Sequence, residues 1–391
     1  MSDPIPTGRQ AKLLIDNADA CVACGLCLDH CPTYRLHQTE AESPRGRIAI
    51  ASGLASGRIA LRKNNVVHLD SCLVCGSCEK VCPAHVHYTE MIDQARALVF
   101  EASKSSRTDR FFNWLTAKKK RLAILAWLLW LYRKTGLRRL TGWLPVSRLP
   151  AVARDYGLKP YYPAPAPARG RVYLFTGCVA ELFDQQTLHS AVRLLNECGY
   201  DVEVPSRQSC CGAVATHCGD TGTAGVHQQR NRQAFSHRIP LIVTSSGCAA
   251  VLQQDPDLAV HDINSFLASA SDGGNLSAPA ASGEKIGLYL PCTLRNKLDA
   301  AQGVFALLKA AGMTDFVDLS EETNCCGAAG TYMFRHAKDA RRLRQKLYRR
   351  IEQERITLVL TMNIGCLLHL LNHAGRWRFR VMHPVTYLAQ R

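Results

Sequence analysis

The sequence reads C-V-A-C-G-L-C-L-D-H-C-P from Cys21 to Pro32, and C-L-V-C-G-S-C-E-K-V-C-P from Cys72 to Pro83. Both runs have the pattern C-x2-C-x2-C-x3-C-P. At this spacing three thiolates bind one iron–sulfur cubane and the fourth binds its neighbour. Zinc sites use separated cysteine pairs rather than a four-cysteine run followed by proline, which makes zinc or disulfides the weaker alternative. The two runs therefore predict two [4Fe–4S] clusters.

The same spacing assigns the ligands of each cluster. We expect the first cluster to be held by Cys21, Cys24, Cys27 and Cys82, and the second by Cys72, Cys75, Cys78 and Cys31. Because each run supplies one ligand to the other cluster, the two clusters are predicted to lie close together and to exchange electrons rapidly.

Length and cysteine content agree with a redox protein. The chain has 391 residues, enough for several domains, and 18 cysteines. Residues 1–10 are polar and contain Pro4 and Pro6, so they do not resemble the apolar core of a signal peptide. We therefore expect a cytoplasmic, reducing location, in which thiols serve as ligands or redox groups.

One basic segment stands out against the formal net charge of +16. Residues 118–144 place lysines and arginines on both sides of an apolar stretch, Leu122 to Tyr132, that contains Trp127 and Trp130. This stretch is shorter than the roughly 20 residues needed to cross a bilayer. Two interpretations remain open: a helix lying in the membrane interface, and a helix buried against the protein or a partner subunit. The segment is too apolar for a groove that follows nucleic-acid phosphates, so we expect no nucleic-acid partner.

The remainder of the chain contains an internal duplication. In the first copy, the strand-like segment 171–176 precedes Cys178, a helical pattern covers 188–196, and Cys210-Cys211-Gly212 and the strand 241–244 before Cys248 follow. In the second copy, the strand 285–290 precedes Cys292, and a helix near 304–310, Cys325-Cys326-Gly327 and the strand 357–361 before Cys366 follow. Two copies of one cysteine pattern are most simply explained by duplication.

Alternating strands and helices predict two α/β domains with parallel strands, related by pseudo-symmetry. Cys178, Cys248, Cys292 and Cys366 each follow a predicted strand and precede a helix. A helix N-terminus favours a thiolate over a thiol, which suits a ligand or a redox group. The predicted organisation is a helical two-cluster module over 1–100, a basic helical connector with a proline-rich linker over 101–168, and two cysteine-rich α/β domains over 169–270 and 271–391.

Four segments resemble one known family: Cys31-Pro32-Thr33-Tyr34, SPRGRI at 43–48, CCGAAGTY at 325–332 and NIGC at 363–366. Over nearly its whole length the chain is similar to the iron–sulfur subunit of bacterial glycolate oxidase. More broadly it resembles proteins that join a two-cluster ferredoxin-like module to two cysteine-rich CCG domains. These include the lactate-utilisation iron–sulfur protein and one subunit each of anaerobic glycerol-3-phosphate dehydrogenase and heterodisulfide reductase. The PRGRI and NIGC segments favour the glycolate oxidase branch.

The resemblance implies an electron-transfer subunit of a flavin-dependent 2-hydroxy-acid dehydrogenase, which passes electrons from FAD on a partner subunit toward the quinone pool. The sequence has no G-x-G-x-x-G motif after a predicted strand, so we expect the flavin only on the partner. The alternative is a heterodisulfide-reductase-type subunit that acts on a disulfide or thiol. A third possibility, outside redox catalysis, is a basic membrane- or nucleic-acid-associated binding protein with structural clusters.

The CCG copies depart from the heterodisulfide reductase pattern. That family has five ligand cysteines per copy for a noncubane cluster, whereas each copy here has four. Four sulfurs suit a cubane, another metal or a metal-free thiol site. The candidate ligands are Cys178, Cys210, Cys211, Cys248, Cys292, Cys325, Cys326 and Cys366, and the candidate redox thiols among them are Cys210, Cys211, Cys325 and Cys326.

Overall fold

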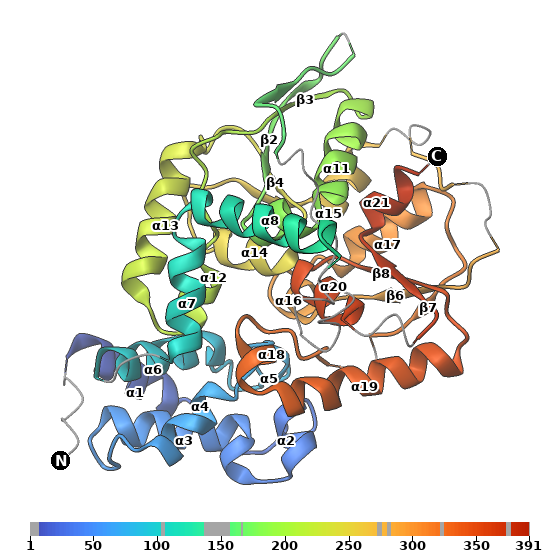
Figure 1. Cartoon of the computed structure of the whole chain (residues 1–391). Coiled ribbons are helices and arrows are strands. Elements are labelled where there is room, and N and C mark those ends of the chain that lie inside the picture. Colours follow the sequence, from blue (N-terminus) through green and yellow to red (C-terminus); the bar gives the residue numbers. More distant parts are fainter. Residues whose placement is uncertain are drawn as a thin grey trace. The chain divides into compact units, whose positions relative to one another are not determined.

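The structure is a computed structural model that describes residues 8–102, 106–136, 157–165, 167–271, 276–279, 283–320, 324–372 and 377–390. The chain divides into two compact units. The first comprises Met1–Asn113, Gly212–Gly225 and Glu321–Lys346, and the second Trp114–Cys211, Val226–Ser320 and Leu347–Arg391. The segments 212–225 and 321–346, which come from the two cysteine-rich repeats, thus belong to the same unit as the N-terminal cysteine runs. Figure 1 colours the chain along its length.

The first unit is helical throughout its described residues. Its elements are α1 (Arg9–Asp19), α2 (Pro32–His37), the 3₁₀ helix η1 (Glu40–Glu42), α3 (Pro44–Ala55), α4 (Lys63–Asp70), α5 (Ser77–Lys80), α6 (Tyr88–Ala102), most of α7 (Arg107–Thr116), α12 (Ala213–His217), α18 (Tyr332–Arg335) and the start of α13 (Thr221–Ala234) and of α19 (Ala337–Gln353). Pro32 and Pro44 open α2 and α3, positions where the missing N–H of proline costs nothing. Helices α1, α3 and α6 enclose a core that includes the fully buried Leu14, Leu69 and Met91.

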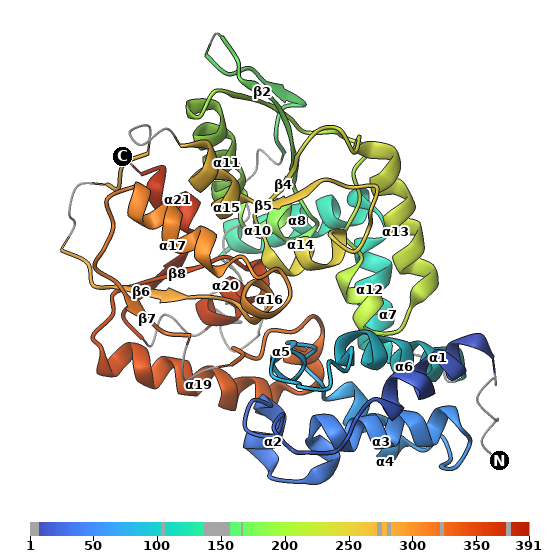
Figure 2. The ribbon, with the colours of Figure 1, turned by 180° about the vertical axis from the view of Figure 1, so that it is seen from behind.

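The second unit contains two sheets. The four parallel strands of each follow the same order, and the first sheet has an additional antiparallel edge strand. The first sheet runs β1-β3-β2-β4-β5 and consists of β1 (Tyr161–Tyr162), β2 (Gly170–Phe175), β3 (Tyr200–Glu203), β4 (Leu241–Val243) and β5 (Val260–Asp262); only β1 is antiparallel. The second runs β7-β6-β8-β9 and consists of β6 (Ile286–Tyr289), β7 (Val317–Asp318), β8 (Leu358–Thr361) and β9 (Arg380–Met382). Figure 2 shows β4 with β5, and β6 with β7 and β8, from behind. The predicted parallel α/β architecture is confirmed, while the pseudo-symmetry stays a prediction.

Helices cover the sheets and join them through one core. They are α10 (Val179–Phe183), α11 (Gln185–Glu197), α14 (Ser246–Leu252), α15 (Ile263–Ala270), α16 (Cys292–Asn296), α17 (Ala301–Ala310), α20 (Ile364–Leu371) and α21 (Pro384–Leu388), with the remaining parts of α13 and α19. Fully buried Leu174 of β2 and Leu288 of β6 belong to the same hydrophobic cluster. The Thr187 and Thr386 hydroxyls, from α11 and α21, are 2.7 Å apart. The two repeats therefore fold around a common core.

The connector has two features that the sequence did not settle. Within the predicted proline-rich linker, Tyr161 and Tyr162 form the edge strand β1 and pair with β3. The apolar segment forms α8 (Lys119–Lys134), whose buried Leu122, Ala126 and Leu129 pack with Leu182 of α10. No helix in the described ranges is long and apolar enough to span a bilayer. Residues 137–144 of the predicted contact segment lie outside the described residues.

Candidate iron–sulfur and thiol sites

The first cysteine-lined cavity lies among the loops of the first unit. Its lining includes Cys21, Cys24, Cys27 and Cys82, the four predicted ligands of the first cluster, together with Cys78. The other lining residues are predominantly apolar. The chain brings the first predicted ligand set together around one space, and the ligand assignment remains a prediction.

A second cavity is lined by the other predicted set. Cys31, Cys72, Cys75 and Cys78 border it, and Cys78 is common to both cavities. No three described cysteine, histidine or acidic side chains surround a single point as the ligands of one metal ion do. The thiolates of a cubane each bind a different iron, so they need not converge in that way. The donor sets fit two iron–sulfur clusters.

Both cysteine runs share an unusual backbone conformation. Ala23 and Gly25 have φ of 54° and 87°, and Val74 and Gly76, at the equivalent positions, have φ of 49° and 72°. The left-handed region costs a non-glycine residue roughly 1–2 kcal/mol, and a β-branched valine tolerates it poorly. The same strained turn in two separate loops indicates a shape required by what the loops enclose.

Several groups direct hydrogen bonds at the sulfurs of the second set. The Val74 N–H lies 3.4 Å from Cys72 Sγ, and the Tyr88 hydroxyl donates to the same sulfur at 3.7 Å. The Thr33 hydroxyl is 3.3 Å from Cys31 Sγ. Hydrogen bonds to cluster sulfurs are one of the means by which proteins set cluster potentials. The surroundings of this set are therefore already arranged to influence a bound cluster.

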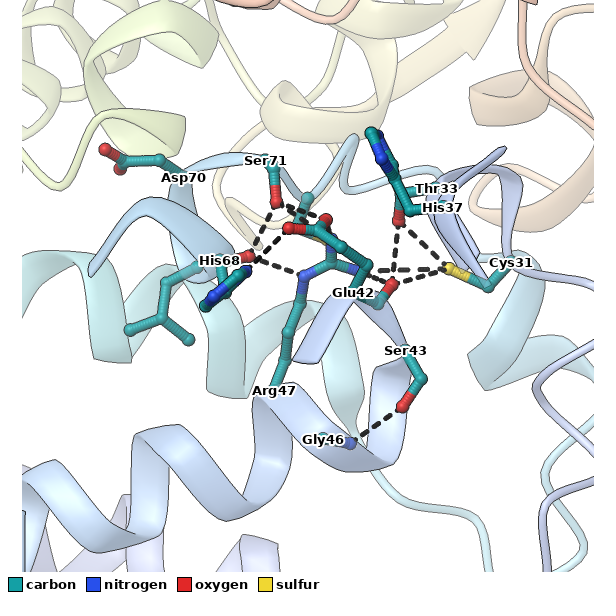
Figure 3. Close-up of polar contacts among 12 residues, drawn as sticks. Cys31, Thr33, His37, Glu42, Ser43, Gly46, Arg47, His68, Asp70 and Ser71 are labelled. Atoms are coloured by element: carbon teal, nitrogen blue, oxygen red, sulfur yellow. Dashed lines mark hydrogen bonds and ion pairs between the residues drawn. The ribbon is translucent and has the colours of Figure 1, made fainter. Parts of the chain in front are cut away.

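Arg47 is the most deeply buried charged side chain of this region, with 1% exposure. Its guanidinium donates to the Glu42 carboxylate at 2.6 Å, to Ser71 Oγ at 3.0 Å and to the His68 carbonyl at 2.6 Å. A further nitrogen lies 3.8 Å from Cys31 Sγ, and Figure 3 shows Arg47 with its contacts to Glu42 and to this sulfur. Burial alone would lower the pKa of Arg47, but the neighbouring tyrosine and cysteine groups and Glu42 outweigh it and raise this pKa.

Glu42 carries the compensating charge. Burial opposes ionisation of its carboxyl, yet Arg47 and hydrogen bonds from Ser71 and His68 hold its pKa below the usual range. The SPRGRI segment contains Arg47, but nothing in its sequence indicates Glu42 as the partner. Glu42 and Arg47 are five positions apart in the sequence. This spacing alone does not predict whether Arg45 or Arg47 is the buried arginine.

Arg96 fastens the loop in front of the second cysteine run. Its guanidinium, 6% exposed, donates to the carbonyls of Leu69, Asp70 and Cys72. It also donates to the His217 carbonyl at 3.0 Å, within the same unit. One side chain thus satisfies the open carbonyls at the end of α4 and positions Cys72.

Two thiols of these sites, Cys27 and Cys78, are disfavoured as thiolates when no metal is bound. Burial raises the pKa of Cys27 to about 11 and that of Cys78 well above its ordinary value. Metal ligation requires deprotonated sulfur, so cluster binding must release these protons.

The four cysteines of the first CCG copy converge in the second unit. Cys178 Sγ lies 3.4 Å from Cys210 Sγ, and Cys211 hydrogen-bonds with both Cys210 and Cys248. Cys178 precedes α10 directly, as predicted, whereas Cys248 lies within the first turn of α14 rather than ahead of the helix. These mutual hydrogen bonds, followed by burial, raise the pKa values of Cys178 and Cys211.

The strand order explains this convergence. Because β2 and β4 are parallel neighbours, the loops that follow them open at the same edge of the sheet and bring Cys178 and Cys248 together. In the second sheet β6 and β8 are likewise neighbours and lead to Cys292 and Cys366.

The second copy distributes its cysteines differently. Cys292 and Cys366 belong to the second unit, whereas the buried Cys325 and Cys326 belong to the first. The Gly327 N–H lies 3.4 Å from Cys325 Sγ.

Asn363 of the NIGC segment joins the strand-end loops of the two copies. Its side-chain oxygen accepts from the Gly365 N–H at 2.8 Å, and its side-chain nitrogen donates to Ser246 Oγ at 3.2 Å. A Cβ at Gly247 would lie 2.8 Å from that nitrogen. The resemblance singled out this segment, and the structure supplies the physical reason: Asn363 caps one cysteine-bearing helix and contacts the loop before another.

Comparison with known proteins gives matches over most of the chain. Family models match residues 17–86 as a 4Fe-4S dicluster domain, and residues 172–253 and 286–371 each as a cysteine-rich domain. The glycolate oxidase iron-sulfur subunit of Escherichia coli is 30% identical over 383 residues, covering 92% of this chain and 91% of that protein. The probable glycolate oxidase iron-sulfur subunit of Bacillus subtilis is 28% identical over 389 residues, covering 90% and 87%. One subunit of the fumarate reductase (CoM/CoB) of Methanothermobacter marburgensis is 24% identical over 359 residues, covering 90% and 67%.

Proposed function

Because the chain belongs to the family of glycolate oxidase iron–sulfur subunits, we propose that it transfers electrons in a flavin-dependent 2-hydroxy-acid dehydrogenase. The substrate is glycolate or lactate, and the acceptor is the quinone pool. The observation that carries the proposal is the pair of cavities in the first unit, each lined by the four cysteines predicted to bind one cluster.

The oxidation itself is assigned to a partner subunit. A 2-hydroxy acid gives up a hydride and a proton, which single-electron carriers do not accept directly. The sequence contains no dinucleotide-binding motif in the required context. FAD on the partner therefore receives the substrate electrons.

This chain holds the electron carriers and sets their surroundings. Two [4Fe–4S] clusters, when bound by Cys21, Cys24, Cys27 and Cys82 and by Cys72, Cys75, Cys78 and Cys31, accept and donate single electrons. Arg47 directs a guanidinium nitrogen toward Cys31 Sγ at 3.8 Å, a contact that would help to set the potential of a bound cluster. The four converging thiols of the first CCG copy offer a further ligand set.

Helix α8 supports contact with the cytoplasmic face of a membrane. Opposite its packed side, Ile124, Trp127 and Leu128 are 59%, 57% and 49% exposed. Lys118 precedes the helix and Lys134 ends it, with its ammonium 4.9 Å from the Trp130 ring centroid. Exposed apolar and tryptophan side chains between cations are typical of a helix lying in an anionic membrane interface, where quinone is available.

Co-purification with a flavoprotein tests the main proposal. The chain should form a complex with an FAD-containing subunit, and this complex should reduce a quinone or a dye with glycolate or lactate. A matched preparation in which Cys75 is replaced by Ala should keep substrate-dependent flavin reduction but lose quinone reduction. Full quinone reductase activity of the flavoprotein without this chain would contradict the proposal.

A heterodisulfide-reductase-type activity is the second candidate. One observation favours it: Cys178 and Cys210, 3.4 Å apart, line an open cavity that a disulfide or thiol substrate can enter. Replacing both Cys210 and Cys211 by Ala separates the candidates. Loss of disulfide reduction with reduced viologen would favour the second, whereas loss of quinone reduction alone would favour the first.

A further inference from the structure

A cavity of about 420 Å³ opens beside the thiols of the first CCG copy. Its size falls within the range of roughly 300–1,000 Å³ that is typical of small-molecule sites. Four segments of the second unit line it, and they are residues 116–118 with Leu122, the turn at Gly177 and Cys178, residues 206–210, and Arg230 with Gln233.

The charged side chains that line the cavity are all cationic. Lys118, Arg207 and Arg230 border the cavity, and its lining includes no acidic residue. Within the described part of the chain, neither Lys118 nor Arg207 forms an ion pair. Among the described residues, the hydrogen-bond acceptor of Arg230 is the Ala117 carbonyl, at 3.2 Å. Uncompensated cations that converge on one space attract anions.

Other arginines of the same unit form ion pairs with carboxylates. Arg171 pairs with Glu203, Arg193 with Glu197, and Arg232, two residues from Arg230, with Asp255. Comparable arginines of this unit are thus neutralised, whereas no carboxylate of the described residues pairs with Arg207 or Arg230.

Hydrogen bonds from Gln208 and Asn231 position residues 208–210 of the lining. Gln208, 3% exposed, accepts from the Thr176 N–H at 2.9 Å and donates to the Leu174 carbonyl at 3.2 Å. Asn231 accepts from the Ser209 N–H at 2.8 Å and donates to the Cys210 carbonyl at 2.9 Å. The cavity is therefore organised before any ligand enters.

We propose that this cavity binds a small organic carboxylate directly beside the sulfurs of Cys178 and Cys210. Arg207 and Arg230 hold the carboxylate, because a guanidinium matches its two oxygens with parallel hydrogen bonds. Lys118 adds charge, and Gln233 offers an amide to the rest of the ligand. The site is separate from hydroxy-acid oxidation on the partner flavin, so it does not depend on the proposed function.

Calorimetric titration of the purified, cluster-containing chain tests the proposal. The probes are glycolate, which represents the substrate class, oxalate, which represents dicarboxylates, and inorganic phosphate. At least one carboxylate should bind with an affinity that falls as salt is added. Arg207→Gln should weaken this binding by about tenfold to hundredfold, the loss expected for one charge-assisted contact.

Two further variants keep the result interpretable. Arg207→Lys retains the charge and should recover part of the affinity, and Arg171→Gln, which removes a paired arginine outside the cavity, should bind as the parent does. Hydrogen exchange should slow at residues 206–210 when the carboxylate is added. Equal binding by Arg207→Gln and Arg171→Gln, no carboxylate binding at millimolar concentration, or preferential binding of phosphate would each overturn the proposal.

Discussion

Replacement of Arg47 by Met is the most direct test of how the cluster module is stabilised. Methionine keeps much of the length and packing of the side chain but removes every donor. The Glu42 carboxylate, whose side chain is 11% exposed, would then lose its 2.6 Å partner and remain charged. Removing one member of a buried ion pair typically costs about 3–5 kcal/mol, because the other charge stays desolvated. Ser71 and His68 still hydrogen-bond to Glu42, so we expect the lower end of this range.

Arg45 provides a matched control two residues away. It also pairs with a glutamate, Glu40, at 2.6 Å, but the Glu40 side chain is 51% exposed. Water replaces such a partner at little cost, so Arg45→Met should change stability far less than Arg47→Met. Both variants are compared by anaerobic urea unfolding, followed by circular dichroism and by the visible absorbance of the clusters.

The pH dependence of the free energy of unfolding identifies why Arg47→Met is less stable than the parent. In the parent, the lowered pKa of Glu42 contributes stability above the unfolded-state pKa, and this contribution is lost as pH falls. In Arg47→Met the pKa of Glu42 rises, so the deficit should shrink between pH 7.5 and 5. Adding Glu42→Gln to Arg47→Met should restore part of the stability at pH 7.5. If Arg47→Met lost no more stability than Arg45→Met, or if its loss of stability did not depend on pH, the reasoning would be refuted.

Three other predictions concern separate sites. Cys75→Ala should lose about half of the iron of the two clusters, measured by iron and sulfide analysis with EPR, and intact iron content would contradict the ligand assignment. Burial raises the pKa of Asp184 to about 7, so the fold should lose roughly 3 kcal/mol as pH rises from 4 to 7, because the unfolded chain releases this proton first. Asp184→Asn should therefore melt higher than the parent at pH 8 but not at pH 4, and an equal difference at both pH values would rule out this cause. Replacing Trp127 and Leu128 together by Ser should weaken sedimentation with anionic vesicles several-fold without lowering the melting temperature, whereas unchanged vesicle binding would exclude α8 as the contact.

The sequence predicted the parts of this protein that depend on local pattern. Cysteine spacing grouped the residues that line the two cavities, and the alternation of strands and helices placed Cys178 and Cys248 at strand ends. Parallel pairing of neighbouring strands then brings those ends to one edge, which is a property of the sheet rather than of particular side chains.

Features that depend on contacts between distant residues were not predictable in this way. Arg45 and Arg47 lie in the same short motif, yet one pairs at the surface and the other is buried. The cavity beside Cys178 is lined by four segments that are separated by dozens of residues. Local propensity contains no information about which arginine turns inward or which loops meet.

The junction between α7 and α8 serves two surfaces at once. Residues 116–118 and Leu122 line the cavity beside Cys178, and the exposed face of Trp127 and Leu128 belongs to the same α8 helix. Arg230 ties this junction to α13 through the Ala117 carbonyl. If binding of α8 to a bilayer shifts the start of this helix, the affinity of the cavity for its carboxylate changes by some factor. Because coupling between two binding sites is reciprocal, the bound carboxylate then changes the affinity of the protein for the membrane by the same factor. A small carboxylate would then change how long the protein stays bound to a membrane surface.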